Sequence, residues 1–251
     1  MTAKTERVVC PADQLAARAA DRILAAAGDA IRSRGRFTLA LSGGSTPEKT
    51  YAILSSPEHA TRLDWSRIYL FFGDDRFVPH DDPRSNCSMA TRSLFSRAPI
   101  EEDHIFRIPT DTTPEDAARK YAQTLATFFG VPADGPPPSF DLILLGLGDD
   151  GHTASLFPGK PAIHEKKAWL AASPPGVLPP PVDRVTFTFP IINAAREALF
   201  LVGGAGKAAV VKSVLEGGAT LEQAPAVGVR PTNGKLTWML DESAAAQLTG
   251  S

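Results

Sequence analysis

The feature that most limits how this chain can fold is a set of continuously apolar runs, each followed directly by a glycine-rich or polar segment. The runs span residues 37–41, 68–72, 141–145 and 198–202. A strand that is apolar on both faces needs cover on both, which is typical of parallel sheets. Helical patterns separate these runs along the chain. The sequence therefore predicts an α/β fold: a doubly wound, mostly parallel sheet with helices on both faces.

Periodicity and end signals predict the remaining elements. Helices are expected over residues 11–35, 47–54, 85–94, 113–129 and 207–215, near 191–195 and after Asp241, and further strands over 185–189, 227–229 and 236–240. Residues 73–84 are expected to form a polar loop, and the proline-rich stretches 130–139 and 174–181 surface loops. The run at 141–145 continues the alternation of strands and helices directly after the first proline-rich stretch. We therefore expect residues 1–251 to form a single domain.

Composition excludes several classes of protein. There are 26 Lys and Arg against 28 Asp and Glu, so no charge excess favours nucleic acid as a partner. Two cysteines cannot build a disulfide framework, and no Cys/His cluster suggests zinc. No apolar run approaches the roughly 20 residues that span a bilayer, and the amino terminus lacks an apolar signal core. We expect a cytoplasmic protein without membrane contact.

Four polar or glycine-rich segments follow predicted strands, at residues 42–46, 74–76, 146–152 and 203–207. In open parallel sheets, ligands bind beyond the carboxyl ends of the strands. The four segments are therefore expected to meet in one site.

Two of these segments are suited to an anion. Gly43 and Gly44 allow close approach to the backbone at a helix start, and Ser45 and Thr46 add hydroxyl donors, which favours phosphate. The alternative is a tight turn with a Ser/Thr cap. Lys207 opposes the dipole of the helix it begins, a cost that a shared anion would offset. Its alternative is a solvated lysine.

Arg76 follows two acids, Asp74 and Asp75, and a guanidinium fork there suits phosphate or developing negative charge. The alternative is a surface ion pair. Adjacent carboxylates could suggest Mg²⁺, but no other residues complete a metal site. We therefore expect neither a metal nor a cofactor.

His152 lies in the most informative segment, where a predicted strand is followed by glycines, then by two acids and then by a histidine. Imidazole ordinarily titrates near about pH 6.5, which suits a general base at neutral pH. Asp150, two residues earlier, could orient the ring. A lone histidine is more often structural or merely exposed, but this position favours function.

Taken together, these segments resemble the 6-phosphogluconolactonase family. The resemblance rests on LALSGGSTPEKTY at 39–51, FFGDDRFVPHDDPRSNCSMA at 71–90 and FDLILLGLGDDGHTASLFPG at 140–159, with GAGKA at 204–208 and WMLDESAA at 238–245. It implies a Rossmann-like fold and metal-independent hydrolysis of 6-phospho-D-glucono-1,5-lactone to 6-phospho-D-gluconate, the second step of the oxidative pentose phosphate pathway. The partner expected is this small sugar-phosphate lactone, bound by a monomer or weak homo-oligomer.

The resemblance also implies roles for residues. His152 matches the family's general base, and Arg76 and Lys207 match phosphate contacts that act with the 43–46 turn. The family usually has Asp-Glu-Arg where this chain has Asp74-Asp75-Arg76, and the shorter acid argues against a direct catalytic role for Asp75. Backbone amides near Gly44 or Arg76 are both candidates for stabilising the oxyanion.

Two alternative functions are considered. A glucosamine-6-phosphate deaminase-like isomerase typically carries Phe-Asn-Glu where this chain has Ser155-Leu156-Phe157, so its acid is missing. A non-catalytic sugar-phosphate sensor would need a helix-turn-helix segment, for which the chain has no spare length, and would not need His152.

Overall fold

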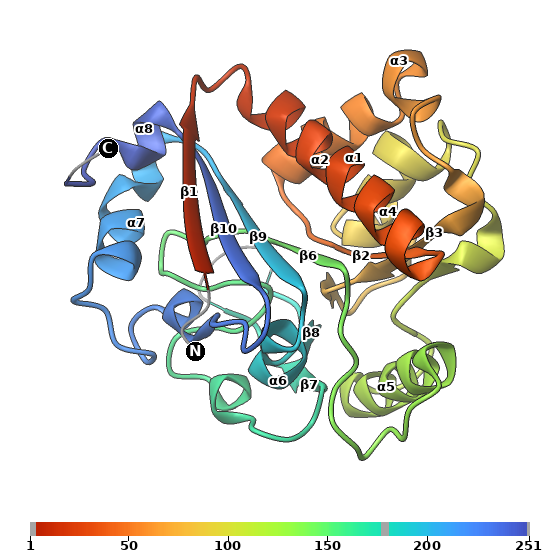
Figure 1. The fold of residues 1–251 in the computed structure, drawn as a ribbon. Coiled ribbons are helices and arrows are strands. Elements are labelled where there is room, and N and C mark those ends of the chain that lie inside the picture. The colour runs from red at the N-terminus through yellow and green to blue at the C-terminus, as the bar shows by residue number, and fades with distance from the viewer. Residues whose placement is uncertain (1–3, 177–180, 250–251) are drawn as a thin grey trace.

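Seven parallel strands form the central sheet of the computed structural model, which describes residues 4–176 and 181–249 (Figure 1). Their spatial order is β1, β10, β9, β6, β2, β3, β5, and every neighbouring pair is parallel. The strands are β1 (Lys4–Cys10), β2 (Phe37–Leu41), β3 (Ile68–Phe72), β5 (Ile105–Phe106), β6 (Leu142–Leu145), β9 (Glu197–Val202) and β10 (Lys235–Asp241). The predicted α/β class is confirmed.

Helices surround this sheet, and most begin or end at the expected signals. Thr113 caps the start of α5, and Gly35 ends α1 in the left-handed conformation. Figure 1 shows α7 and α8 beside β1, and α1 and α2 over the other half. The helices are α1 (Leu15–Arg34), α2 (Ser45–Leu54), α3 (Pro57–Ala60), α4 (Asn86–Ala90), α5 (Pro114–Phe129), α6 (Phe189–Asn193), α7 (Ala208–Leu215) and α8 (Glu242–Ala245).

A second, antiparallel sheet of three strands was not predicted. It consists of β4 (Asp74–Arg76), β8 (Arg184–Phe187) and β7 (Leu170–Ser173), in the order β4, β8, β7. The expected polar loop at 73–84 therefore begins as a strand, and the expected strand at 185–189 ends at Phe187 because α6 starts at Phe189. These short strands exist through pairing with distant segments, which local patterns do not reveal.

Other boundaries also differ from expectation. Residues 4–10 form an edge strand that was missed because its polar residues break the apolar pattern. The first helix begins at Leu15, since residues after Pro11 make a turn that the Gln14 amide closes on the Pro11 carbonyl. The segment 227–229 is not a strand; a short 3-10 helix occupies Pro225–Gly228. Part of the predicted 174–181 loop lies outside the described residues.

Both cysteines, Cys10 and Cys87, are buried and free. Among the described residues, no helix is long and apolar enough to cross a membrane.

Two buried tyrosines fasten the ends of the central strands. The Tyr51 hydroxyl, on α2, donates to the Ser42 carbonyl and accepts from the Ser42 amide, both at 2.9 Å. The Tyr121 hydroxyl, on α5, accepts from the Phe72 amide and donates to the Phe106 carbonyl, again at 2.9 Å. Each helix thus holds the backbone where β2, or β3 and β5, leave the sheet.

We expect Tyr51→Phe and Tyr121→Phe each to lower the free energy of unfolding by about 1–3 kcal/mol, because each leaves a buried amide and carbonyl without a partner. Urea unfolding at neutral pH measures this. Tyr69→Phe is the matched control, since the Tyr69 hydroxyl makes no hydrogen bond within the described residues, and its effect should stay within about 0.5 kcal/mol. Equal effects of all three substitutions would contradict the role of the two hydroxyl contacts.

Candidate active site

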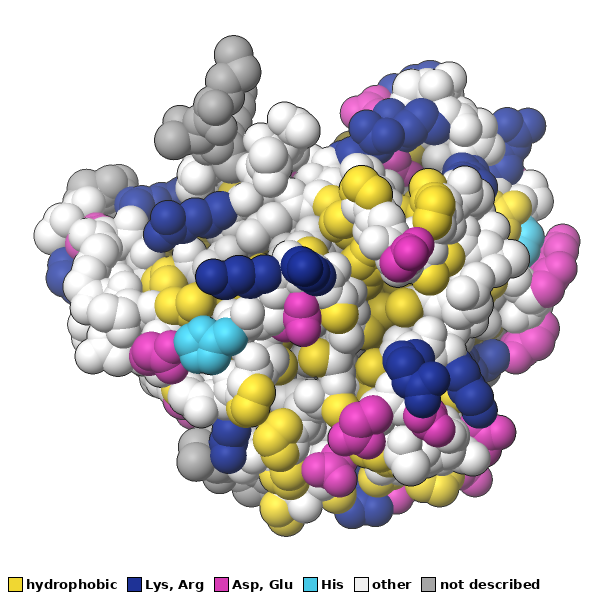
Figure 2. Space-filling model, turned by 90° about the horizontal axis from the view of Figure 1, so that it is seen from below, with side chains coloured by type: hydrophobic (Ala, Val, Ile, Leu, Met, Phe, Trp, Pro, Cys, Tyr) yellow, Lys and Arg dark blue, Asp and Glu magenta, His cyan; other side chains and the backbone are white. Residues whose placement is uncertain are grey.

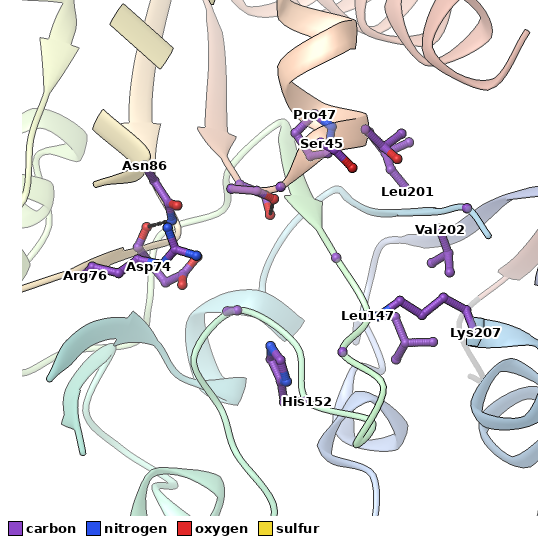
Figure 3. Close-up of a pocket in the computed structure, with 18 of the residues that line it drawn as sticks. Ser45, Pro47, Asp74, Arg76, Asn86, Leu147, His152, Leu201, Val202 and Lys207 are labelled. Atoms are coloured by element: carbon purple, nitrogen blue, oxygen red, sulfur yellow. Dashed lines mark hydrogen bonds between the residues drawn. The ribbon is translucent and has the colours of Figure 1, made fainter. Parts of the chain in front are cut away.

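A cavity of about 280 Å³ opens where β2, β6 and β9 end (Figure 3). All four segments singled out in the sequence contribute to its wall. Of the eight predicted site residues, seven line the cavity: Gly43, Gly44, Ser45, Thr46, Arg76, His152 and Lys207. The eighth, Asp150, lies behind His152 and is not part of the wall.

The turn before α2 is shaped by two glycines. A Cβ on Gly43 would lie 2.1 Å from the Oδ1 atom of Asn86, so no larger residue fits there without moving Asn86. Gly44 has a φ of 111°, a conformation that other residues rarely adopt. No side chain caps the first turn of α2, which leaves the amides of Ser45 and Thr46 available at the positive end of the helix. This arrangement suits an anion.

Lys207 reaches the cavity from the single turn of 3-10 helix that precedes α7, so α7 begins one residue later than predicted. Its Nζ atom lies 2.5 Å from the Oδ1 atom of Asp149; the Lys207 side chain is 25% exposed and that of Asp149 65%. The turn itself is fixed by Asp241, whose carboxylate accepts from the Gly204 amide at 2.7 Å and from the Ala244 amide at 2.6 Å. The ammonium group is thereby held at the cavity by a mostly exposed carboxylate.

Arg76 and Arg184 are paired across the antiparallel sheet and both line the cavity. Arg76 Nη1 donates to the carbonyl of Arg84 at 2.6 Å, which fixes its direction. Arg184 is 5% exposed, and burial lowers the pKa of its guanidinium while nearby Asp74 opposes that shift. Sequence reasoning missed Arg184. Recognising β8 as the partner of β4 would have been needed to find it.

The two acids before Arg76 serve different parts of the structure. Asp75 does not line the cavity; its carboxylate accepts from the amides of Asn86 and Cys87 and from the Ser85 hydroxyl, and so holds the start of α4. Burial raises the pKa of Asp75, although these hydrogen bonds act in the opposite direction. The Asp75 carboxylate therefore stabilises the local fold and does not contribute to the cavity wall.

Asp74 does line the cavity, and it also fastens the loop that carries His152. Its Oδ2 atom accepts from the Ser155 hydroxyl at 2.7 Å. The Ser155 amide donates to Thr186 Oγ1 at 3.1 Å, and the Ser155 carbonyl accepts from the Ser173 hydroxyl at 2.7 Å. All three β-strands of the small sheet therefore hold Ser155. Its neighbour Ala154 has a φ of 48°, an unusual conformation for a residue with a side chain.

The His152 ring points into the cavity (Figure 3). Its Nδ1 atom lies 2.6 Å from Asp150 Oδ1, which also accepts from the His152 amide at 3.1 Å. A Cβ on Gly148 would lie 2.0 Å from Nδ1, so the ring occupies space that only glycine leaves open. With Nδ1 engaged, Nε2 is the ring nitrogen that remains for a substrate or water.

Hydrogen bonds from His152 keep the carboxyl group of Asp150 ionised. Partial burial acts to raise the pKa of its carboxyl group, but hydrogen bonds from the His152 ring and amide outweigh burial and hold the pKa below its usual value. At neutral pH an ionised Asp150 therefore faces Nδ1, which favours the tautomer with a proton on Nδ1 and a lone pair on Nε2.

Among the described residues, the side chains that line this cavity do not form a cluster of metal ligands. Asp74 is the one carboxylate among the described residues that line it, and its Oδ2 atom binds Ser155. Within the described chain, the side chains that could jointly hold an ion are Glu101, Asp103 and His104, and none of these lines the cavity.

Comparison with known proteins places the chain in a family. A family model described as glucosamine-6-phosphate isomerases/6-phosphogluconolactonase matches residues 11–238. A 6-phosphogluconolactonase of Nostoc sp. is 40% identical over 247 residues, covering 98% of this chain and 99% of the relative. A 6-phosphogluconolactonase of Synechocystis sp. is 43% identical over 220 residues, covering 87% and 88%.

A solved structure agrees with these sequence relatives. The 6-phosphogluconolactonase from Trypanosoma cruzi superposes with a TM-score of 0.88 at 31% identity, covering 100% of this chain and 99% of the other. The extent of the family match, together with identities above 30% over nearly the whole length, shows that this chain belongs to the glucosamine-6-phosphate isomerase/6-phosphogluconolactonase family.

Proposed function

We propose that this protein is a hydrolase that opens 6-phospho-D-glucono-1,5-lactone to 6-phospho-D-gluconate, the second step of the oxidative pentose phosphate pathway. The observation that carries the proposal is that a hydrogen-bonded His152–Asp150 pair faces the same cavity as the uncapped start of α2. A base and an anion cradle at one cavity are what a phosphorylated lactone requires. The sequence relatives and the solved structure described above carry the name of this activity.

The phosphate is assigned to the α2 side of the cavity. The amides of Ser45 and Thr46 and their hydroxyls would donate to its oxygens, and Lys207 would supply a positive charge. The phosphate would then share Lys207 with Asp149, whose side chain is mostly exposed to solvent. These contacts hold a part of the substrate that does not react.

The reaction itself needs a base, a water molecule and stabilisation of negative charge. His152 Nε2 accepts a proton from water as the water oxygen bonds to the lactone carbonyl carbon. The tetrahedral intermediate then expels the ring oxygen, which takes the proton from the imidazolium as the carboxylic product forms. The product carboxyl group loses its own proton to solvent. Asp150 holds the ring and stabilises its positive charge during this sequence.

Arg76 is assigned to the charge that develops on the carbonyl oxygen. Figure 3 places Arg76 and Lys207 on opposite sides of the cavity, with His152 between them. A substrate whose phosphate lies at Lys207 would therefore extend its lactone toward the arginine side. There the Arg76 fork, next to Arg184, provides donors for an oxyanion.

An isomerase related to glucosamine-6-phosphate deaminase is the alternative enzyme. That reaction calls for an acid close to the histidine, and this chain has Ser155 at the start of the corresponding segment. Ser155 is fully buried and bound to Asp74, so it does not enter the cavity. A sugar-phosphate sensor is the alternative without catalysis, and turnover of the lactone distinguishes it.

We also propose that the enzyme acts in the cytoplasm without a metal, as a monomer or weak homo-oligomer. The support for metal independence is that the acidic side chains of the site have other partners: Asp74 binds Ser155, Asp149 binds Lys207 and Asp150 binds His152.

Substitution of His152 tests the mechanism. We expect His152→Ala to lower kcat by roughly 10²–10⁴-fold, the usual contribution of a positioned base, with the fold unchanged. Asp150→Asn should lower kcat less, because it removes orientation and charge but not the base. In the wild type, kcat should fall in acid, since protonation removes the lone pair on Nε2. The assay generates the lactone with glucose-6-phosphate dehydrogenase and follows its disappearance.

Two controls make this test specific. His164→Ala changes a histidine that pairs with Glu222 away from the cavity, and it should leave kcat unchanged. Spontaneous hydrolysis of the lactone must be subtracted at every pH. A folded His152→Ala protein within a few-fold of wild type would overturn the assignment.

Substitution of Lys207 tests the phosphate site. Lys207→Ala should raise KM more than it lowers kcat, because a phosphate remote from the carbonyl is held equally in the ground and transition states. Lys212→Ala is the matched control: Lys212, on α7, pairs with Glu216 just after the helix and does not line the cavity. An unchanged KM in Lys207→Ala would remove this residue from the phosphate site.

Removal of divalent ions tests metal independence. Dialysis against EDTA is expected to leave kcat intact, because each of the three carboxylates is committed to a protein donor. Steady-state assays before and after dialysis, with and without added Mg²⁺, measure this. A rate that disappears on dialysis and returns with Mg²⁺ would contradict the proposal.

A further inference from the structure

A second cavity, of about 600 Å³, lies at the opposite end of two strands that lead to the active site. Thr38, near the start of β2, and Asp141, directly before β6, line it, whereas the active-site cavity begins where β2 and β6 end. On the face shown in Figure 2, Lys and Arg side chains border a hollow that exposes hydrophobic side chains. The proposed hydrolysis uses no residue of this second cavity.

Positive charge is in excess in its lining. Arg34, Arg36 and Arg196 line the cavity together with a single carboxylate, Asp141. That carboxylate is 9% exposed, and its contacts are complete. Oδ1 lies 2.8 Å from Arg34 Nε and 3.5 Å from Arg196 Nε, and Oδ2 accepts from the Thr38 amide and hydroxyl at 2.9 Å each. One negative charge therefore pairs with two arginines, so one of their two positive charges has no counter-charge among the described residues that line the cavity.

Arg36 is the arginine that Asp141 does not hold. Within residues 4–176 and 181–249, no carboxylate forms an ion pair with it. Its guanidinium lies over the Phe128 ring, 4.5 Å from the centroid, and 5.6 Å from that of Phe129. Stacking on aromatic rings orients a guanidinium while leaving its edge N–H groups able to donate. Such an edge is suited to the oxygens of a phosphate.

Most of the remaining wall is aromatic and apolar, formed by Tyr69, Phe129, Val131 and Pro138 together with Gly35 and Ser139. We propose that this cavity is a second ligand site, which takes a nucleotide-like phosphate monoester. Its phosphate binds Arg36 and Arg196, and its flat ring packs against Tyr69 and Phe129. A cavity of this size is within the range that proteins use for small organic ligands. The combination of an arginine edge with an aromatic wall distinguishes such a ligand from a bare anion.

The test is calorimetric titration of the whole protein with AMP, ribose 5-phosphate and inorganic phosphate. AMP should bind more tightly than the other two, because only AMP presents both a phosphate and a ring. Arg36→Gln and Arg196→Gln should each weaken AMP binding about tenfold or more, the usual loss for a charged hydrogen-bond donor. Arg97→Gln is the matched control, since exposed Arg97 lines neither cavity, and it should leave the affinity unchanged.

Binding at the active site is separated by Lys207→Ala, which should retain the affinity for AMP. The proposal is overturned if AMP fails to bind at millimolar concentration, if Lys207→Ala abolishes binding while Arg36→Gln does not, or if inorganic phosphate binds as tightly as AMP. Loss of Arg196 also disturbs Asp141, so each variant is checked by its urea unfolding curve. Arg36→Gln decides the outcome if Arg196→Gln does not fold, because Arg36 has no ion pair to lose in the described chain.

Discussion

The position of β6 between β2 and β9, parallel to both, is the constraint on which the active site depends. Parallel pairing brings the carboxyl ends of the three strands to one edge, where a glycine lies within two residues of the end of each strand. The glycine turn after β2, the loop with His152 after β6 and the turn with Lys207 after β9 thus reach a common cavity although they are distant in sequence. Tyr51 reinforces this geometry, since its hydroxyl binds the backbone of Ser42 at the exit from β2.

Close packing around the His152 ring and the turn before α2 depends on glycines. The ring of His152 lies where a Cβ of Gly148 would be, and Asn86 lies where a Cβ of Gly43 would be. Asn86 also donates to the Asp74 carbonyl, at 2.9 Å, so the glycine turn after β2 packs through Asn86 against the strand that carries Arg76. The glycines therefore do more than allow a turn: they let neighbouring functional segments touch, and a larger residue would separate them.

Buried hydrogen bonds connect the small antiparallel sheet to the histidine loop. Ser155 is bound by Asp74 on β4, Thr186 on β8 and Ser173 on β7, so all three strands fix one residue that lies three positions after His152. Buried polar groups need partners, and a network of this kind is costly to break at any member. The small sheet thus contributes two arginines to the cavity wall and also holds the loop that carries His152.

The sequence by itself determined the elements whose signal is local. Apolar runs predicted β2, β3, β6, β9 and β10 of the central sheet but not β1 or β5, and glycines at the strand ends predicted the site edge. The two-residue spacing of Asp150 and His152 was sufficient to predict their contact, because it is made within one turn. Tertiary structure alone decided the rest. Several features depend on partners many residues away: the place of Arg184 in the site, the capping role of Asp75, the Lys207–Asp149 pair and the edge strand β1. The cavity at the opposite sheet edge likewise forms only where Arg34, Asp141 and Arg196 come together. Long-range pairings are set by packing of the whole chain, which no single segment encodes.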